Sequence, residues 1–435
     1  MKKLVAMLLA AVTVLSMCTA CGKKDTAAPK TPQEGQEQVK ETSGEPITIN
    51  FMGALYSDKT EPYIQSVIDA FEAEHENIKI NLEIVGWDNI DTRISAMVGA
   101  KQAPDLYNGG SVTSYIEDEL VYPIEEVVSP ELKEDFFPAF WNNNIIPEYG
   151  TSFQLPYLAS VRALYYNKDI FEEVGIEAPP KTWEEVEEDC AKIKEFYDGE
   201  VYAWGIDACL AGNDSNLAYY GWNNGGGYVD ENNAYKLNCE ENVEAFEWMK
   251  YLYDSGYTNQ NPTIELRDDL QKLVVADKLA MQITANFFPT LYPDANLGIA
   301  PIPYNDKRVS ESSALAVQDC LAVFNENAKE GKDTPEKMAA IREFLDFFYS
   351  PEYYVPFMIQ EGMLPATQSG AEMLTKEDPE KAAYLDALSG AKFQPSNKVN
   401  WPDCGQGLNE VVQKILTGMQ TPQEALDELQ SQLTE

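Results

Sequence analysis

The chain has 435 residues, of which 44% are hydrophobic and 11% aromatic, so it is long enough for two domains and apolar enough to pack both. It carries 32 basic and 72 acidic residues, which gives a formal net charge of −40. So acidic a chain is repelled by phosphate backbones and by anionic lipid heads, which excludes nucleic acid and the bare membrane surface as ligands.

The first residues have the features of a bacterial secretion signal. Lys2 and Lys3 make the first three residues a short basic region, and residues 4–17 form a mostly apolar run that is too short to span a bilayer. Two small residues then precede Cys21, which resembles the lipobox of bacterial lipoproteins, although Cys18 stands where that pattern prefers Leu. We expect a signal peptide over residues 1–20 and a lipid anchor at Cys21; an ordinary secretory leader cut nearby is the alternative.

A polar segment follows the leader. Residues 22–46 contain no aromatic residue and are rich in Lys, Glu, Gln, Pro, Thr and Gly. A composition of this kind cannot bury a core, so residues 21–45 are predicted to form a disordered tether.

Apolar periodicity after the tether predicts alternating strands and helices. The predicted order is strand 47–54, helix 63–75, strand 78–84, helix 87–100 and strand 103–110. Such βαβ units build a parallel sheet. Ligands of parallel sheets bind at the carboxyl ends of the strands, which selects the loops that contain Tyr56 and Asn108.

The apolar run 158–166 predicts a buried strand, after which Asn167 and Gly175 can cap and end a helix. Two later helix starts, Thr182–Glu185 and Thr421–Glu424, have the spacing of a capping box. Between them we predict strands at 202–207, 278–284 and 297–303 and helices at 183–197 and 243–253.

Several segments in this order resemble the extracellular solute-binding proteins, family 1, of ABC importers. They are Pro-Tyr at 156–157, Leu-Tyr-Tyr-Asn-Lys-Asp at 164–169, Pro-Pro-Lys-Thr-Trp-Glu-Glu at 179–185, and an aromatic and Gly-rich turn at 219–228. Each motif is moderately specific, but their shared order covers nearly everything after Pro46.

The resemblance implies an α/β fold of the type II periplasmic-binding-protein kind, in which two lobes, each a mainly parallel sheet flanked by helices, are joined by three crossings. The crossings are expected at 158–164, 314–318 and 362–366. The first lobe would then comprise residues 46–158 and 319–362, and the second lobe residues 159–318 and 363–435.

The resemblance also implies a ligand cleft between the lobes. Sugars present hydroxyl groups to carboxylates, amides and Arg, and apolar ring faces to aromatic side chains. The candidate ligand-binding residues are Tyr56, Asn108, Arg162, Trp222, Asn223, Phe287, Asp319, Trp401 and Asp403. Two alternatives stay open: Trp222 or Phe287 is plain core, and Arg162 with Asp319 is a structural ion pair.

Catalytic and metal chemistry find little support. His75 is the only histidine, which leaves no His for a catalytic triad or a His-rich metal site. The chain lacks a phosphate-binding P-loop, and Asp230 begins a calcium-like loop in which Tyr235 occupies the position that needs Gly. Five scattered cysteines beyond Cys21 suggest buried thiols, with a disulfide left open. We therefore expect that the protein is not an enzyme and that it binds no cofactor and no metal ion.

The sequence therefore predicts a monomeric, lipid-anchored receptor on the extracytoplasmic face of the cell membrane, at a Gram-positive cell surface. Its solute would be a carbohydrate, most simply an oligosaccharide, which it would deliver to the permease subunits of an ABC importer. The alternatives are a receptor for a phosphate ester, a polyamine or a peptide, and a surface adhesion or scaffold lipoprotein.

Overall fold

The computed structural model describes residues 46–210 and 215–434. The predicted signal peptide, the anchor at Cys21 and the tether lie outside these residues. Residues Glu45–Glu435 form one compact unit. Nowhere in the described residues is a helix both long enough and apolar enough to cross a membrane.

The described strands form a nine-stranded sheet and a separate two-stranded one. The order in the large sheet is β2-β1-β3-β10-β6-β8-β7, with β11 paired to β10 and β9 paired to β6. The strands are β1 (Ile47–Ala54), β2 (Ile78–Val85), β3 (Leu106–Gly109), β4 (Ile145–Ile146), β5 (Thr151–Ser152), β6 (Leu155–Asn167), β7 (Tyr202–Gly205), β8 (Leu279–Ala285), β9 (Leu297–Ala300), β10 (Leu315–Val323) and β11 (Lys392–Phe393).

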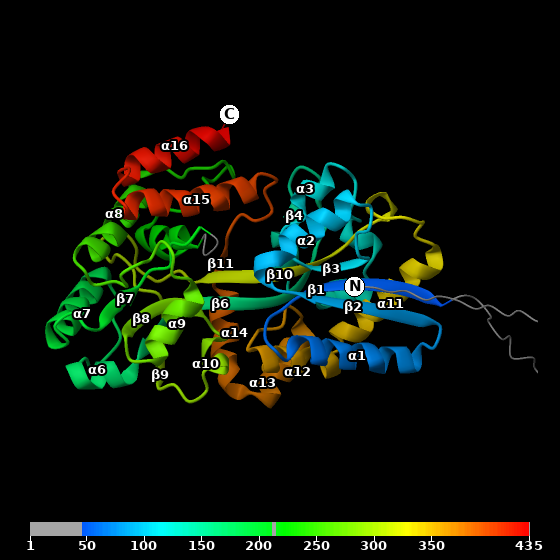
Figure 1. The fold of residues 1–435 in the computed structure, drawn as a ribbon, viewed down its shortest axis with the longest axis horizontal. Coiled ribbons are helices and arrows are strands. Elements are labelled where there is room, and N and C mark those ends of the chain that lie inside the picture. Colours follow the sequence, from blue (N-terminus) through cyan, green and yellow to red (C-terminus); the bar gives the residue numbers. More distant parts are fainter. Residues whose placement is uncertain (1–45, 211–214, 435) are drawn as a thin grey trace, which may run out of the picture. The chain divides into compact units, whose positions relative to one another are not determined.

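Strand β6 holds the sheet together. Its first half pairs antiparallel with β10, and its second half pairs antiparallel with β8 and β9. Figure 1 shows β6 and β10 side by side across the centre of this unit. Farther out, β1 pairs parallel with β2 and β3, and β7 pairs parallel with β8. The α/β class and the parallel pairing of the first three strands are therefore confirmed.

Helices cover the sheet, and most begin at residues that the sequence marks. Both predicted capping boxes form: Thr182 and Glu185 bond each other's backbone N–H groups, as do Thr421 and Glu424. The helices are α1 (Thr60–Glu74), α2 (Trp87–Gly99), α3 (Thr113–Ile116), α4 (Pro130–Asp135), α5 (Pro138–Asn143), α6 (Lys168–Val174), α7 (Trp183–Phe196), α8 (Glu240–Asp254), α9 (Arg267–Val275), α10 (Phe288–Leu291), α11 (Pro335–Tyr349), α12 (Pro351–Glu361), α13 (Gln368–Glu377), α14 (Ala382–Ser389), α15 (Trp401–Leu416) and α16 (Pro422–Thr434).

Two large apolar cores flank the crossing strands. The first core includes Ile49, Phe344 and Leu388 and lies under α1, α11 and α12. The second core includes Trp183 and Leu408 and lies under α7, α8, α15 and α16. The two-lobe division by residue range stays a prediction, and this packing favours placing residues 363–388 with the first lobe, because Leu388 and its neighbours join the first core.

The three predicted crossings adjoin one another. Ala159 pairs with Gln318 of β10 and exchanges two backbone hydrogen bonds of 2.8 Å with Leu364. Asn286, at the end of β8, accepts a hydrogen bond from the backbone of Val161 and donates one to the carbonyl of Gly362, each at 2.8 Å. Any relative movement of the two cores must therefore bend these segments together.

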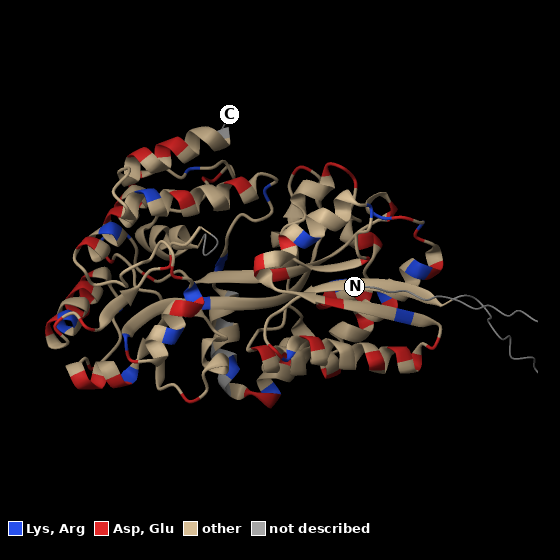
Figure 2. Cartoon of the chain, viewed as in Figure 1, with Lys and Arg blue, Asp and Glu red and all other residues tan. Residues whose placement is uncertain are grey.

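Acidic side chains gather on the helices and loops, while the central strands carry few of them (Figure 2). This distribution fits the role of a solvated surface. The five cysteines within the described residues are present as thiols, so the disulfide alternative is not realised there.

Candidate functional site

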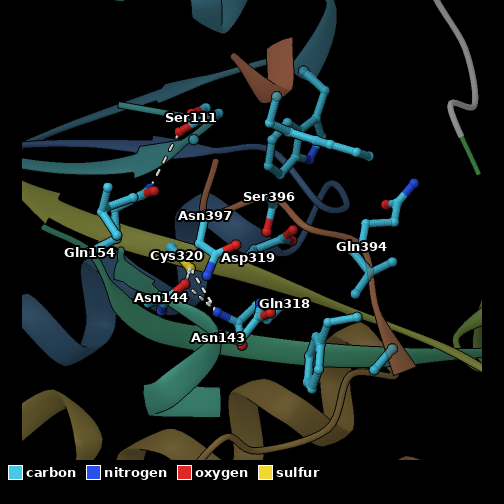
Figure 3. A pocket seen from close by; sticks show the side chains of 18 residues that line it. Ser111, Asn143, Asn144, Gln154, Gln318, Asp319, Cys320, Gln394, Ser396 and Asn397 are labelled. Atoms are coloured by element: carbon cyan, nitrogen blue, oxygen red, sulfur yellow. Dashed lines mark hydrogen bonds between the residues drawn. The ribbon is translucent and has the colours of Figure 1, made fainter. Parts of the chain in front are cut away.

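A pocket of about 340 Å³ lies where β10 passes the carboxyl ends of the first strands. Figure 3 shows polar side chains converging on it from β10, from the loop after β3 and from the segment after β11. The uncharged polar residues that line it are Ser111, Asn143, Asn144, Gln154, Gln318, Gln394, Ser396 and Asn397. Asp319 is the only charged lining residue of the described chain. We call this hollow the site pocket.

A larger hollow, about 420 Å³, is lined by Asn167, Asp169 and residues from the range 274–297. It contains none of the predicted ligand-binding residues, whereas the site pocket contains Asp319 and Trp401. The site pocket also lies at the strand ends where ligands of parallel sheets bind. It is therefore the candidate site.

Trp87 gives this pocket an exposed aromatic face that the sequence analysis missed. Its side chain is 42% exposed, and Tyr56 meets its ring edge-on at 5.8 Å between ring centres. Trp87 follows β2 just as Tyr56 follows β1 and Ser111 follows β3. The rule that selected Tyr56 and Asn108 could have found Trp87 too, had the residue not been assigned only to the start of a helix.

Three predicted residues from distant parts of the chain meet at one hydrogen-bonded group. The Tyr56 hydroxyl lies 3.0 Å from the Asp319 carboxylate, to which it donates, and 3.3 Å from Oδ1 of Asn108. Burial raises the pKa of Asp319, while the bond from Tyr56 and the charges of Arg162 and Arg267 oppose the rise. Burial also raises the pKa of Tyr56, which therefore remains a donor.

Asn108 itself serves the fold. Its side chain is 1% exposed, accepts from the backbone of Ala54 and donates to the carbonyl of Cys320 at 3.1 Å. It therefore positions Tyr56 beside Asp319 and has little surface left for a solute.

An amide pair on the pocket wall keeps unused hydrogen-bonding capacity. Gln318 donates to Oδ1 of Asn144 at 2.5 Å. Nδ2 of Asn144 and Oε1 of Gln318 are buried and have no partner among the described residues. Buried polar atoms of native proteins are normally bonded. Both residues line the pocket, so a rotation of either side chain would present an unused donor or acceptor to a solute hydroxyl group, which offers both functions.

Arg162 and Phe287 are not among the residues that line the pocket. Arg162 is 8% exposed and donates to the Ser160 hydroxyl at 2.8 Å. No carboxylate of the described residues lies within ion-pair distance of it, so the alternative of a structural ion pair between Arg162 and Asp319 is not realised. The ring of Phe287 packs against the first core and carries the guanidinium of Arg267 at 5.1 Å from the ring centre.

The remaining candidates divide between packing and the pocket. Trp401 lines the pocket and is 8% exposed. Trp222 is 7% exposed, packs against Tyr228 and is not among the residues that line the pocket. Asn223 is fully buried and bonds the backbone of Ser313. Asp403 is exposed in the first turn of α15. Of these four, the structure brings only Trp401 to the pocket.

A sequence model of the bacterial extracellular solute-binding proteins matches residues 56–355. The chain belongs to this family. The family predicted from the sequence is therefore confirmed, and the members of this family are binding proteins, so this solute-binding protein is not an enzyme. Among its described residues, no group of three His, Cys, Asp or Glu side chains is placed to hold a metal ion.

Relatives of this solute-binding protein span most of its length. It is 29% identical over 380 residues to a binding protein of Brucella abortus (strain 2308), which covers 86% of this chain and 89% of that protein. It is 25% identical over 398 residues to the sn-glycerol-3-phosphate-binding periplasmic protein UgpB of Escherichia coli (strain K12), covering 84% of this chain and 86% of that protein.

The fold of this solute-binding protein is also that of a sugar-bound structure. Maltose-bound MalE3 of T. maritima matches it with a TM-score of 0.76 and 17% identity, over 89% of this chain and 99% of that chain. At this identity the match establishes the fold, including its type II periplasmic-binding-protein architecture.

Proposed function

We propose that the chain is the solute receptor of an ABC importer and that its solute is a carbohydrate bound in the site pocket. The observation that carries the proposal is the pocket lining: uncharged amides and hydroxyls, one carboxylate, and the exposed ring of Trp87. Such a surface suits a molecule with many hydroxyl groups and an apolar ring face. The maltose bound to MalE3 of the same fold supports this choice.

The relatives named for sn-glycerol 3-phosphate make a phosphate ester the second candidate. Within the described chain, the pocket lining itself contains no Lys, Arg or His, which disfavours a small phosphate ester held wholly inside it. Its single carboxylate likewise gives a polyamine few partners. A peptide or an adhesion role finds no specific support.

Capture of the solute would depend on closure of the two lobes around it. The predicted lobes, with residues 363–388 assigned to the first lobe because they pack in its core, would move as rigid bodies about the three crossings, and a solute touching both would stabilise the closed form. The closed, monomeric receptor would then meet the permease at the extracytoplasmic face of the membrane. A lipid at Cys21 would hold it there, at a Gram-positive cell surface.

A thermal-shift screen of the mature chain tests the proposal. The panel contains mono- and oligosaccharides, glycerol 3-phosphate, spermidine and a tripeptide. A ligand at one hundred times its Kd stabilises the folded state by about 2.7 kcal/mol, which raises the melting temperature measurably. We expect a carbohydrate to give the largest shift and to lower the radius of gyration in solution scattering. A shift only with a non-carbohydrate, or with nothing in the panel, would overturn the proposal.

A further inference from the structure

Arg162 is a largely buried cation that forms no ion pair with any carboxylate of the described residues. Its side chain is 8% exposed, and the one protein group bonded to its guanidinium is the Ser160 hydroxyl. A guanidinium has five N–H donors. Most of them therefore meet no acceptor in the described chain, and because none of the Arg162 nitrogens is among the fully enclosed polar atoms without a partner, these donors can be reached from solvent.

Another buried cation of the same molecule shows the contrast. Lys329, whose side chain is 9% exposed, lies 2.5 Å from Asp105 and 3.1 Å from Asp333. The fold thus pairs a buried charge when that charge serves packing. The missing partner of Arg162 points to a group that arrives from outside.

Strand pairing places Arg162 beside the site pocket. Ser160 lies opposite Val317 in the β6–β10 ladder, and side chains of alternate residues share a sheet face. Arg162 therefore shares its face with Val317 and Asp319, both of which line the pocket. The charges of Arg162 and Arg267 also favour the charged form of Asp319 and so lower its pKa, although neither forms an ion pair with it in the described chain.

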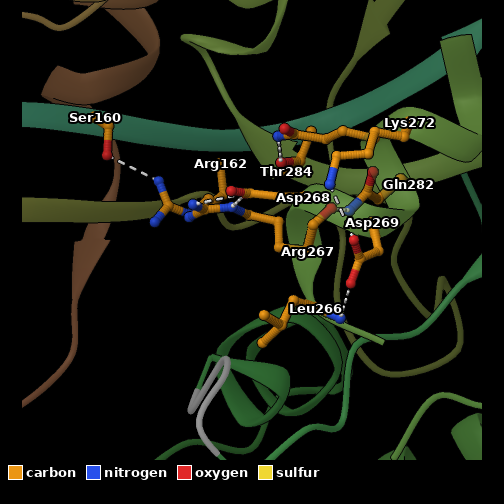
Figure 4. A network of polar contacts seen from close by, with 10 residues as sticks. Ser160, Arg162, Leu266, Arg267, Asp268, Asp269, Lys272, Gln282 and Thr284 are labelled. Carbon is orange, nitrogen blue, oxygen red and sulfur yellow. Dashed lines mark hydrogen bonds and ion pairs between the residues drawn. The ribbon is translucent and has the colours of Figure 1, made fainter. Parts of the chain in front are cut away.

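Arg267, at the start of α9, supplies a second guanidinium. Figure 4 shows Arg162 reaching Ser160 and Arg267 reaching Asp268. Arg267 lies over the ring of Phe287 at 5.1 Å, which limits its orientations. Its side chain is 34% exposed, and that of its ion-pair partner Asp268 is 60% exposed, so solvent weakens this pair and the guanidinium can exchange partners.

We propose that Arg162 and Arg267 form a subsite for an oxyanion, and that the solute is an acidic carbohydrate whose neutral part occupies the site pocket. The planar, forked donors of arginine match carboxylate and phosphate oxygens equally well. The charged group is therefore a carboxylate, as in a uronic acid, or a phosphate ester of the sugar. This inference rests on the proposed carbohydrate function.

Titration calorimetry with matched sugars tests it. The probes are galactobiose against digalacturonate, and glucose against glucuronate and glucose 6-phosphate, so the carboxylate and phosphate arms are separate. We expect an acidic member to bind at least tenfold more tightly than its neutral counterpart. Arg162→Gln should weaken binding of the acidic member about 10- to 100-fold, which is the loss expected when hydrogen bonds to a charged group are removed. The affinity for the neutral sugar should stay unchanged.

Two further variants keep the test decisive. Arg93→Gln removes an exposed Arg that pairs with Glu83 and should bind like the wild type. Arg267→Gln alters a partly exposed residue, so it carries the test if the Arg162 variant fails to fold in a melting control. Neutral sugars that bind as well as their acidic counterparts would overturn this inference and leave the carbohydrate proposal standing. If no sugar of either kind binds, both fail.

Discussion

Trp87 exposes 42% of its side chain at the site pocket, whereas Trp222 exposes 7% and packs in the second core. Trp87→Ala should therefore weaken carbohydrate binding by about 1–3 kcal/mol, the scale of a stacked aromatic contact, with little loss of stability. Trp222→Ala is the matched control and should cost about 3–5 kcal/mol of stability, as a buried Trp does. Titration calorimetry and thermal melting separate the two, and unchanged binding by the Trp87 variant would contradict the prediction.

Asp319 makes stability depend on pH. Burial raises its pKa in the folded chain, so the folded state holds the proton more tightly than the unfolded state does. The carboxyl group therefore lowers stability as the pH rises through that raised pKa. Asp319→Asn should melt at a higher temperature than the wild type at pH 7, and the gain should disappear below the ordinary pKa of Asp, about 3.9. Melting curves from pH 3 to 7 check this, and a pH-independent difference would contradict it.

The roles of single residues were harder to predict from the sequence than the helices and strands. Asp319 and Arg162 could be selected because a crossing strand must pass the cleft. Asn108 and Asn223 stand in equally suggestive loops, yet their amides bond backbone groups such as those of Cys320 and Ser313, far along the chain. An amide beside an aromatic residue has the same pattern in either role, so the sequence alone could not separate them.

At the scale of the elements, Gly362 ends α12 at the third crossing and lies against the start of α10. It has φ of 70°, and a Cβ there would lie 2.6 Å from Oγ1 of Thr290 and 2.9 Å from Cβ of Phe287. Gly418 has φ of 72° with open space around it. Each Ala substitution should cost about 1–2 kcal/mol for the left-handed backbone. Gly362→Ala should lose clearly more, because it also displaces α10. Equal losses in urea unfolding would show that this contact is unimportant.

Most elements could be predicted because their signals are local. Apolar alternation marked β2, and capping boxes marked the starts of α7 and α16. The wall formed by Gln394, Ser396 and Asn397 had no such signal. It follows β11, a strand of two residues, which is too short for any period and is defined only by its pairing with β10.

At the scale of the whole molecule, we predict that a lipid on Cys21, which lies outside the described residues, holds the protein at the membrane. Mass spectrometry of the mature N-terminus should find a lipid-modified Cys21, since two acyl chains give stable anchoring. Cys21→Ser should release the chain into the medium with its solute affinity unchanged. An unmodified terminus elsewhere, or a variant that stays with the membrane, would refute the anchor.

The first core has a consequence for the order of events in the cell. It joins Ile49, near the start of the described chain, to Leu388, in the last helices before α15. Contacts between residues so far apart in sequence form slowly, and this core cannot be completed until nearly the whole chain has been synthesised. The chain thus lacks a finished first core throughout synthesis, which is the state that export under the predicted signal at residues 1–20 would require.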